Sequence, residues 1–176
     1  SAALELGAEV ILISGPTAIE INHIKLNRID VVTAAQMMEA VIDHYAIASI
    51  AISAAAVSDY SPKHKASQKI KKENSDARLT LELIKTKDIL GYMGENKKNQ
   101  IVIGFALETE NEEVNAKAKM ITKNVDAIIL NVLHQENEVF NSDKNEITIF
   151  HKDGRQVNFK KQSKLSLAHE IFKQIL

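Results

Sequence analysis

Three apolar runs, separated by stretches with helical spacing, most strongly constrain what this chain can fold into. The longest, Ala46 to Val57 (AIASIAISAAAV), has no charged residue, and Ile101 to Ala106 and Ala127 to Val132 have the same character. Such runs are typical of strands that are covered on both faces, as in parallel sheets. Ala34 to Tyr45 and Glu112 to Lys123 instead show the spacing of helices. The alternation predicts an α/β protein in which the first two runs are central strands.

The other segments fit a doubly wound, mostly parallel sheet of the Rossmann-like kind. In chain order, we expect the end of a helix at Ala2 to Leu6, a buried strand at Glu9 to Ser14, a short strand at Asp30 to Thr33, a helix at Asp88 to Gly94, a hairpin of Glu146 to Phe150 and Gln156 to Lys160, and an amphipathic helix at Ser163 to Leu176.

The segment from Ser58 to Ile84 departs from this plan. It begins with polar and basic sequence and ends in LTLELI, which alternates like a half-exposed strand. We expect a β excursion outside the main sheet, and the alternating Leu79, Leu81 and Leu83 suggest that it mediates a homodimer. No repeat or linker divides the rest, so residues 1–176 are predicted to be one domain, with 58–84 as its dimerisation and active-site flap.

Composition excludes several classes of protein. The chain has 176 residues, 22 basic and 23 acidic, with a net charge of -1, so no overall field favours nucleic acid or an anionic membrane. It has no cysteine, no apolar run approaching the roughly 20 residues of a membrane span, and no metal-ligand spacing among its six histidines. We expect a soluble, cytoplasmic protein without a membrane or nucleic-acid partner, and its metal ligands, if any, are not predicted.

Ligands of such sheets bind beyond the carboxyl ends of the strands, so the residues there are candidates for a site. Ser14 and Gly15 end the first strand, where glycine lets the backbone approach a phosphate, although a simple turn leaving the sheet is the more common explanation. Ala55 and Ala56 leave room for a flat ligand, and the Asp59 carboxylate can accept hydrogen bonds from a ribose or a base amine. Helix packing and loop capping are the alternatives for these three residues.

Lysines and one aromatic residue complete the candidates. Lys69 begins a basic cluster whose ammonium groups could stabilise negative charge in phosphoryl or nucleotidyl transfer, although such clusters are usually solvated. Phe105, at the end of a buried strand, could stack on a base or belong to the core. Lys119 and Lys123 are four residues apart on one helix face, an arrangement that suits a polyphosphate or a solvent-exposed face.

In order and spacing, these segments resemble one family along essentially the whole chain. The resemblance is carried by LISGP at Leu12 to Pro16, AAAVSDYSP at Ala54 to Pro62, QKIKK at Gln68 to Lys72, LTLELIKTKDIL at Leu79 to Leu90, GFALETEN at Gly104 to Asn111, FNSDKNEITIF at Phe140 to Phe150 and SKLSLAHEI at Ser163 to Ile171. These motifs are similar to those of the bacterial, CTP-using phosphopantothenoylcysteine synthetases.

The resemblance implies a ligase of coenzyme A biosynthesis. CTP would activate the carboxylate of 4'-phosphopantothenate as an acyl cytidylate, and the amine of L-cysteine would then displace CMP. Mg²⁺ accompanies the triphosphate in this family, the enzymes are homodimers, and many are preceded by a flavin-dependent decarboxylase domain.

The resemblance also assigns roles to residues. Lys69 would be the catalytic cation, and Asp59 with the backbone of Ala55 and Ala56 would hold the nucleotide and the acyl intermediate. Phe105 would line the base pocket and Lys119 and Lys123 would bind the triphosphate. Ser14 and Gly15, at the LISGP turn, belong to the same predicted nucleotide site, and cytosine would be read by the backbone of Lys87, Asp88, Ile89 and Leu90, although the family usually has proline in place of Lys87.

The family also begins with a strand and a loop bearing an asparagine, and this chain enters after that loop. The leading alternative is therefore a noncatalytic nucleotide-binding or dimerisation fragment. A dinucleotide oxidoreductase is disfavoured, because no G-x-G-x-x-G follows any strand.

Overall fold

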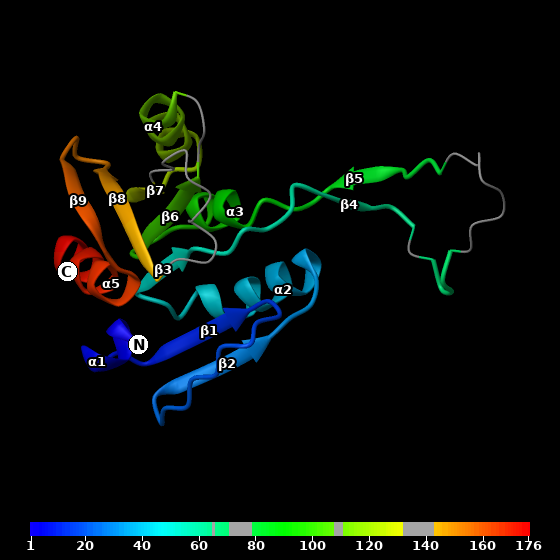
Figure 1. Ribbon diagram of the computed structural model, residues 1–176, viewed down its shortest axis with the longest axis horizontal. Helices are drawn as coiled ribbons and strands as arrows, with labels where there is room; N and C mark the ends of the chain where they lie inside the picture. Colours follow the sequence, from blue (N-terminus) through cyan, green and yellow to red (C-terminus); the bar gives the residue numbers. More distant parts are fainter. Residues whose placement is uncertain (65, 71–78, 108–110, 132–142) are drawn as a thin grey trace.

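The structure is a computed structural model that describes residues 1–64, 66–70, 79–107, 111–131 and 143–176. A body of helices and sheets carries a long two-stranded arm that projects away from it (Figure 1). The elements are α1 (Ala2–Glu5), β1 (Val10–Ser14), β2 (Leu26–Asp30), α2 (Ala34–Tyr45), β3 (Ile50–Ser53), β4 (Tyr60–Pro62), β5 (Leu83–Lys85), α3 (Ile89–Glu95), β6 (Ile101–Leu107), α4 (Glu112–Thr122), β7 (Ala127–Asn131), β8 (Lys144–His151), β9 (Gln156–Ser163) and α5 (Lys164–Ile175).

The body is organised around a five-stranded sheet in the order β3-β6-β7-β8-β9. The first three strands are parallel, and β8 and β9 complete the sheet as an antiparallel hairpin. The predicted α/β class with a mostly parallel central sheet is thus confirmed, as is the hairpin near the end of the chain. Both strands at the centre, β6 and β7, were recognised from their apolar runs.

Both faces of the central strands are covered. On one face, Val102 and Ile128 pack with Met38 of α2, Leu90 of α3 and Ala116 of α4. On the other, residues of β6, β7 and β8 pack with α5. This arrangement explains why β6 and β7 lack polar alternation, because a strand buried on both faces needs apolar side chains in both directions.

The run Ala46–Val57 behaves differently from the prediction. Only Ile50–Ser53 forms a strand, and β3 lies at the edge of the five-stranded sheet, where Ile52 is 40% exposed. Ala46 caps the end of α2, and residues 54–56 lie beyond the strand and are exposed. The prediction of a central strand here was wrong, because alanines contributed much of the apolar character and can equally end a helix or line a loop.

The strands β1 and β2 form a separate parallel pair, in register from Val10 opposite Leu26 to Ser14 opposite Asp30. The expectation of one continuous sheet is therefore wrong for the described residues. The strand expected at 30–33 ends instead at Asp30, because Thr33 is the N-cap of α2. There Thr33 and Gln36 form a reciprocal capping box, which satisfies backbone donors at the start of the helix.

The described parts of the segment 58–84 lie outside the five-stranded sheet, as predicted, whereas its role in dimerisation stays a prediction. Within it, β4 and β5 form an antiparallel pair with Tyr60 opposite Lys85. The expected strand 79–84 is replaced by the shorter β5, and Leu79, Leu81 and Leu83 are 64%, 57% and 53% exposed. The arm thus presents apolar side chains to solvent in a single copy of the chain.

The helices expected from periodicity are present, with shifts of one or two residues at their ends. Asp88, Asn111 and Ser163 lie at the N-caps of α3, α4 and α5, and Val132 of the third apolar run lies outside the described residues. In the portions of the chain for which coordinates are described, no helix is long and apolar enough to cross a membrane.

One buried polar residue stands out in the five-stranded sheet. His151, the last residue of β8, is 6% exposed, and its Nε2 atom has no hydrogen-bond partner. Burial disfavours the charged ring and, with the nearby positive charge of Arg155, lowers the pKa of His151 below its ordinary value despite Asp153. The folded protein therefore holds this histidine neutral under conditions in which the unfolded chain binds a proton.

We predict that His151 makes the protein less stable in acid. As the pH falls below about 6.5, the unfolded state takes up a proton on this ring before the folded state does, so the free energy of unfolding decreases. His151→Leu should reduce this decrease between pH 7.5 and pH 5.5, as measured by urea denaturation at each pH. Ile149→Val, in the same strand, should cost about 1 kcal/mol at both pH values and leave the pH dependence unchanged. Equal pH dependence in wild type and His151→Leu would contradict the assignment.

Candidate functional site

A charged cluster lies where α3 begins, beside the end of α4. The Asp88 side chain caps α3, because its Oδ1 atom accepts a hydrogen bond from the Gly91 N–H at 2.9 Å. Its Oδ2 atom is ion-paired with the ammonium of Lys123. Asp88 and Lys123 are both partly exposed, so the cluster is open to a ligand from solvent.

The electrostatics of the cluster favour an ionised Asp88. Partial burial opposes ionisation, but hydrogen bonds from Lys123 and from the Gly91 N–H, with the charges of Lys123 and Lys119, outweigh it and lower the pKa of Asp88. At neutral pH the cluster therefore contains two ammonium groups and one carboxylate, with a local net charge of +1. This is a small positive site on a chain whose overall charge is -1.

Lys119 connects this cluster to the end of β6. Its Nζ donates a hydrogen bond to the backbone carbonyl of Phe105 at 3.1 Å. Phe105 is partly exposed near the carboxyl end of this buried strand, the edge at which ligands of α/β sheets bind. The sequence predicted both lysines, Asp88 and Phe105, and the structure brings together Asp88, the two lysines and the backbone carbonyl of Phe105. The Phe105 side chain instead packs on the opposite face of the sheet, against the cluster that contains α5.

The base of the arm joins the neighbouring segments. The Thr86 hydroxyl donates to the carbonyl of Ser58 at 2.6 Å, and its N–H donates to the carbonyl of Asp59 at 2.9 Å. Asp59 is thus held beside the strand that leads directly into Asp88. Thr86 was not predicted as a functional residue, and its place within the LTLELIKTKDIL motif was the only signal that could have indicated it.

Close packing sets the position of α3. Leu90 lies against β6 at Gly104, where an added Cβ would be 2.7 Å from Leu90 Cδ2. At the other end of the helix, a Cβ on Gly94 would overlap the backbone carbonyl oxygen of Lys123. The buried Tyr45 hydroxyl donates to the Met93 carbonyl at 2.6 Å and holds α3 to α2. Sequence reasoning singled out none of Gly94, Tyr45 and Met93 as part of a site.

The other predicted residues are spread more widely. Ile89 and Leu90 are buried in the first turn of α3, whereas Lys87 is exposed just before it. Ala55 and Ala56 are exposed between β3 and the arm. Ser14 is the last residue of β1, in the separate pair of strands, and Gly15 follows it.

Lys69 is exposed in the segment 66–70, which lies at the far end of the arm beyond β4 and β5 (Figure 1). The rest of its basic cluster, Lys71 and Lys72, and the end of the GFALET motif, Glu108 and Thr109, lie outside the described residues. The structure therefore leaves the predicted role of Lys69 a prediction.

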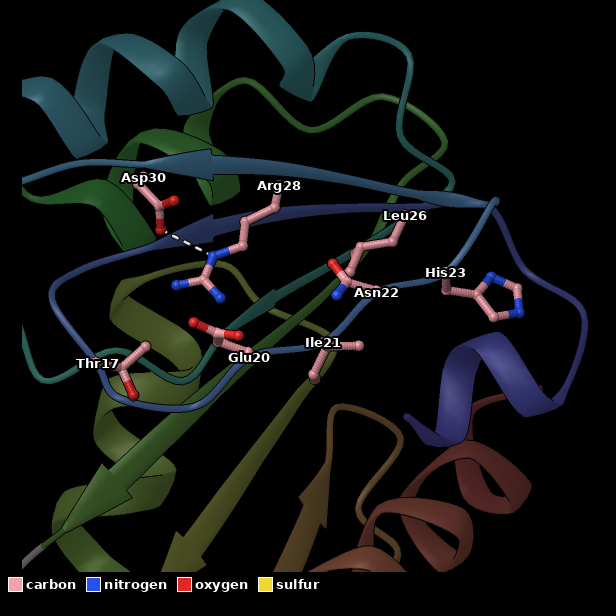
Figure 2. A pocket seen from close by; sticks show the side chains of 8 residues that line it. All are labelled: Thr17, Glu20, Ile21, Asn22, His23, Leu26, Arg28 and Asp30. Carbon is pink, nitrogen blue, oxygen red and sulfur yellow. Dashed lines mark hydrogen bonds and ion pairs between the residues drawn. The ribbon is translucent and has the colours of Figure 1, made fainter.

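A cavity of about 470 Å³ lies elsewhere, on the β1–β2 pair. Figure 2 shows the Arg28 side chain within it, between Asp30 and Glu20. The guanidinium is already paired with Asp30 at 2.8 Å and with the Ile19 carbonyl at 2.8 Å. Of the predicted site residues, only Ser14 borders this region, in an adjoining cavity of about 260 Å³. We therefore place the candidate site at Asp88 and the two lysines.

The described part of the chain offers no ready metal cage, because no three histidine, aspartate or glutamate side chains gather within it. Asp88, the one acid of the cluster, is occupied by Lys123 and by the N-terminus of α3. Mg²⁺ usually keeps several waters and binds through substrate phosphates. If Mg²⁺ takes part, its ligands here would be phosphate oxygens and water more than protein side chains.

Comparison with known proteins gives a consistent result along the chain. The profile of a family described as the DNA/pantothenate metabolism flavoprotein C-terminal domain matches residues 1–176. The chain is 43% identical over 174 residues to the coenzyme A biosynthesis bifunctional protein CoaBC of Bacillus subtilis, and 38% identical over 159 residues to that of Escherichia coli. It is also 39% identical to a protein named cysteine/cysteine sulfinic acid decarboxylase, from an unknown prokaryotic organism.

The matches cover nearly all of this chain but less than half of each relative. The match to the Bacillus subtilis protein covers 99% of this chain and 42% of that protein. The match to the protein named as a decarboxylase covers 99% of this chain and 48% of that protein. The chain thus spans about half the length of the curated relatives it matches, or less.

Solved structures give the same fold. The C-terminal domain of a coenzyme A biosynthesis bifunctional protein CoaBC matches with a TM-score of 0.79 and 38% identity, covering 98% of this chain and 76% of that one. A DNA/pantothenate metabolism flavoprotein from Streptococcus pneumoniae matches with a TM-score of 0.77 at 23% identity, which supports the fold alone.

We predict that the Asp88 side chain stabilises the protein mainly as a helix cap. Asp88→Ala should lower the free energy of unfolding by about 1 kcal/mol, the usual effect of losing an N-cap. Asp88→Asn keeps a capping oxygen and loses only a partly exposed ion pair, so it should cost less than about 0.5 kcal/mol. Urea denaturation at pH 7 measures both, with Glu95→Ala at the C-terminal end of α3 as the control. Equal losses in the two Asp88 variants would show that the ion pair, and not the cap, is the stabilising contact.

Proposed function

Because this chain belongs to the family of the DNA/pantothenate metabolism flavoprotein C-terminal domain, we propose that it acts in coenzyme A biosynthesis as a phosphopantothenate–cysteine ligase that uses CTP. The observation that carries the proposal is the cluster of Asp88, Lys119 and Lys123 at the end of β6, in a chain similar along its whole length to proteins named for that pathway. Its net positive charge suits a triphosphate better than a neutral cofactor.

The proposed reaction has two steps. A carboxylate oxygen of 4'-phosphopantothenate attacks the α-phosphorus of CTP, which forms an acyl cytidylate and releases pyrophosphate. The amine of L-cysteine then attacks the acyl carbon, the bond to the cytidylate oxygen breaks, CMP leaves, and the amine loses a proton to solvent. Mg²⁺, when bound with CTP, would supply charge neutralisation of the phosphates.

Lys119 and Lys123 would bind the triphosphate in this scheme. In the structure their ammonium groups are held by the Phe105 carbonyl and by Asp88, so phosphate oxygens would compete for donors that are already oriented. Preoriented donors lose little conformational freedom on binding, which favours affinity. Phe105, partly exposed at the same edge, would line the base pocket, and the backbone at Asp88, Ile89 and Leu90 would read the cytosine edge.

Asp59, Ala55 and Ala56 would hold the nucleotide and the acyl intermediate from the segment between β3 and the arm. Thr86 supports this assignment, because it ties the carbonyl of Asp59 to the strand that enters α3. Ser14 and Gly15 would contribute backbone from the end of β1. These roles extend the family resemblance to positions that the geometry leaves accessible.

Lys69 is the proposed catalytic cation. The segment that carries it lies at the far end of the arm, whereas Lys119 and Lys123 lie on the body (Figure 1). We propose that the arm delivers Lys69 to the site of a second copy, which would make the ligase active as a homodimer.

A flavin-dependent decarboxylase domain is the proposed neighbour in the whole protein, since the relatives are longer and one is named as a decarboxylase.

We predict that Lys69→Gln lowers turnover by on the order of a hundredfold, the usual scale for losing one electrostatic stabiliser, while CTP affinity changes little. Lys119→Gln should do the reverse and weaken CTP binding first. Steady-state kinetics with CTP, 4'-phosphopantothenate and L-cysteine on the full-length protein, with ATP as the comparison nucleotide, measure both effects. Equal efficiency with ATP would contradict the nucleotide assignment, and CTP binding without any turnover would favour the noncatalytic alternative.

We also predict a homodimer formed through the arm. Leu81→Asp places a charge among the exposed apolar side chains of the arm and should shift the protein to a monomer at micromolar concentration. Glu82→Gln is the matched control. Glu82 pairs with Lys63 across the arm of the same chain, so this substitution should leave the dimer intact. Light scattering gives the mass of each variant. A wild-type protein of monomer mass would refute both the dimer and the delivery of Lys69 between copies.

A further inference from the structure

Two glycines occur within the seven residues of α3, at Gly91 and Gly94. Glycine weakens a helix relative to alanine, so local propensity disfavours both. A Cβ at Gly91 would meet the flexible Asp88 carboxylate, 2.5 Å from Oδ2. A Cβ at Gly94 would overlap the backbone carbonyl oxygen of Lys123 and lie 2.9 Å from its carbonyl carbon. Gly94 is therefore the position at which a missing side chain lets two backbones touch.

Lys123 spans α3 from one end to the other. Its carbonyl rests against Gly94, near the C-terminal end of α3. Its ammonium is paired with Asp88, which precedes Gly94 by six residues at the N-terminal end of the same helix. A helix rises about 1.5 Å per residue, so these two contacts are separated by roughly 9 Å, which suits an extended lysine lying along the helix. The reach of the ammonium thus depends on how closely the Lys123 backbone is seated.

A second contact supports the same seating. Asn124, the next residue, adopts a positive φ of 50° and donates from Nδ2 to the Gly94 carbonyl at 2.9 Å. The end of α4 is thus fixed to the end of α3 at Gly94, by the backbone contact with Lys123 and the hydrogen bond from Asn124. A separate hydrogen bond ties α3 to α2, because the Tyr45 hydroxyl donates to the neighbouring Met93 carbonyl.

We propose that Gly94 is a positioning residue for the nucleotide site, because its absent side chain seats the Lys123 backbone on α3 and so directs the ammonium to Asp88 and to the triphosphate. The triphosphate part of this inference rests on the proposed function, whereas the seating of Lys123 does not. If Gly94 served packing alone, its substitution would reduce stability and leave the geometry of the charged cluster unchanged in the folded protein.

The direct test is an NMR titration of the Asp88 carboxyl group in wild type and in Gly94→Ala. Displacing Lys123 removes a hydrogen bond and a nearby positive charge from Asp88, so its pKa should rise toward the usual value for aspartate. Tyr45→Phe, which removes the hydrogen bond between α2 and the Met93 carbonyl, should leave the Asp88 pKa unchanged. Asn124→Ala weakens the same seating without adding an atom, should shift the pKa in the same direction, and decides the test if Gly94→Ala does not fold.

A double-mutant cycle on CTP affinity provides the second readout. Gly94→Ala and Lys123→Met should each raise the Kd of the full-length protein for CTP by on the order of tenfold, as expected for loss of a charged hydrogen bond. If Gly94 acts through Lys123, the double variant should bind no more weakly than Lys123→Met alone, whereas independent effects would multiply.

An Asp88 pKa that does not move in the folded variants, or multiplying effects in the cycle, would overturn the proposal. Failure of the wild-type protein to bind CTP would instead refute the proposed function, and the Asp88 titration would still decide whether Gly94 positions Lys123.

Discussion

The burial of β6 and β7 between two layers of helices is the constraint on which the rest of the body depends. Ile103, Ile128 and Ile129 are fully buried, and the peptide groups of these strands have no water to bind. They must pair with neighbouring strands, which β3 and β8 provide on either side. The helices α2, α3 and α4 cover one face and α5 the other, so these helices are held in place by packing against this sheet.

A single aspartate anchors the end of this sheet opposite the site. Asp126 Oδ2 accepts from the Val102 N–H at 2.8 Å, and Oδ1 pairs with Lys97 at 2.8 Å. Its carbonyl accepts from the Lys152 N–H at 2.8 Å and so reaches the β8–β9 hairpin. Asp126 thus holds the start of β6. At the other end of β6, the Phe105 carbonyl accepts a hydrogen bond from Lys119. The polar contacts of Asp126 and those of the candidate site thus lie at opposite ends of the same strands.

The β1–β2 pair is attached to the body through helices. The helix α2 packs on β1, and α1 contacts α5, where Glu5 and His169 lie 2.8 Å apart. The arm, by contrast, projects away from the body (Figure 1). Its apolar side chains Leu79, Leu81 and Leu83 are exposed. These two features explain why part of the apolar surface of the chain is exposed in a single copy. They also separate the elements that build the charged cluster from the elements that carry Ser14 and Lys69.

The sequence by itself determined the α/β class, the central position of β6, the buried strand β7, the helices and the final hairpin, because burial on one or two faces leaves a periodic pattern in the chain. It also indicated Asp88, Phe105, Lys119 and Lys123, since strand ends and a helix face can be located from that periodicity. Only the tertiary structure decided that β3 lies at an edge, that β1 and β2 pair apart, and that Lys69 lies at the far end of the arm. The contact between Gly94 and Lys123 was likewise beyond the sequence, because it depends on the distance between two helices, and no local pattern records how closely two backbones approach.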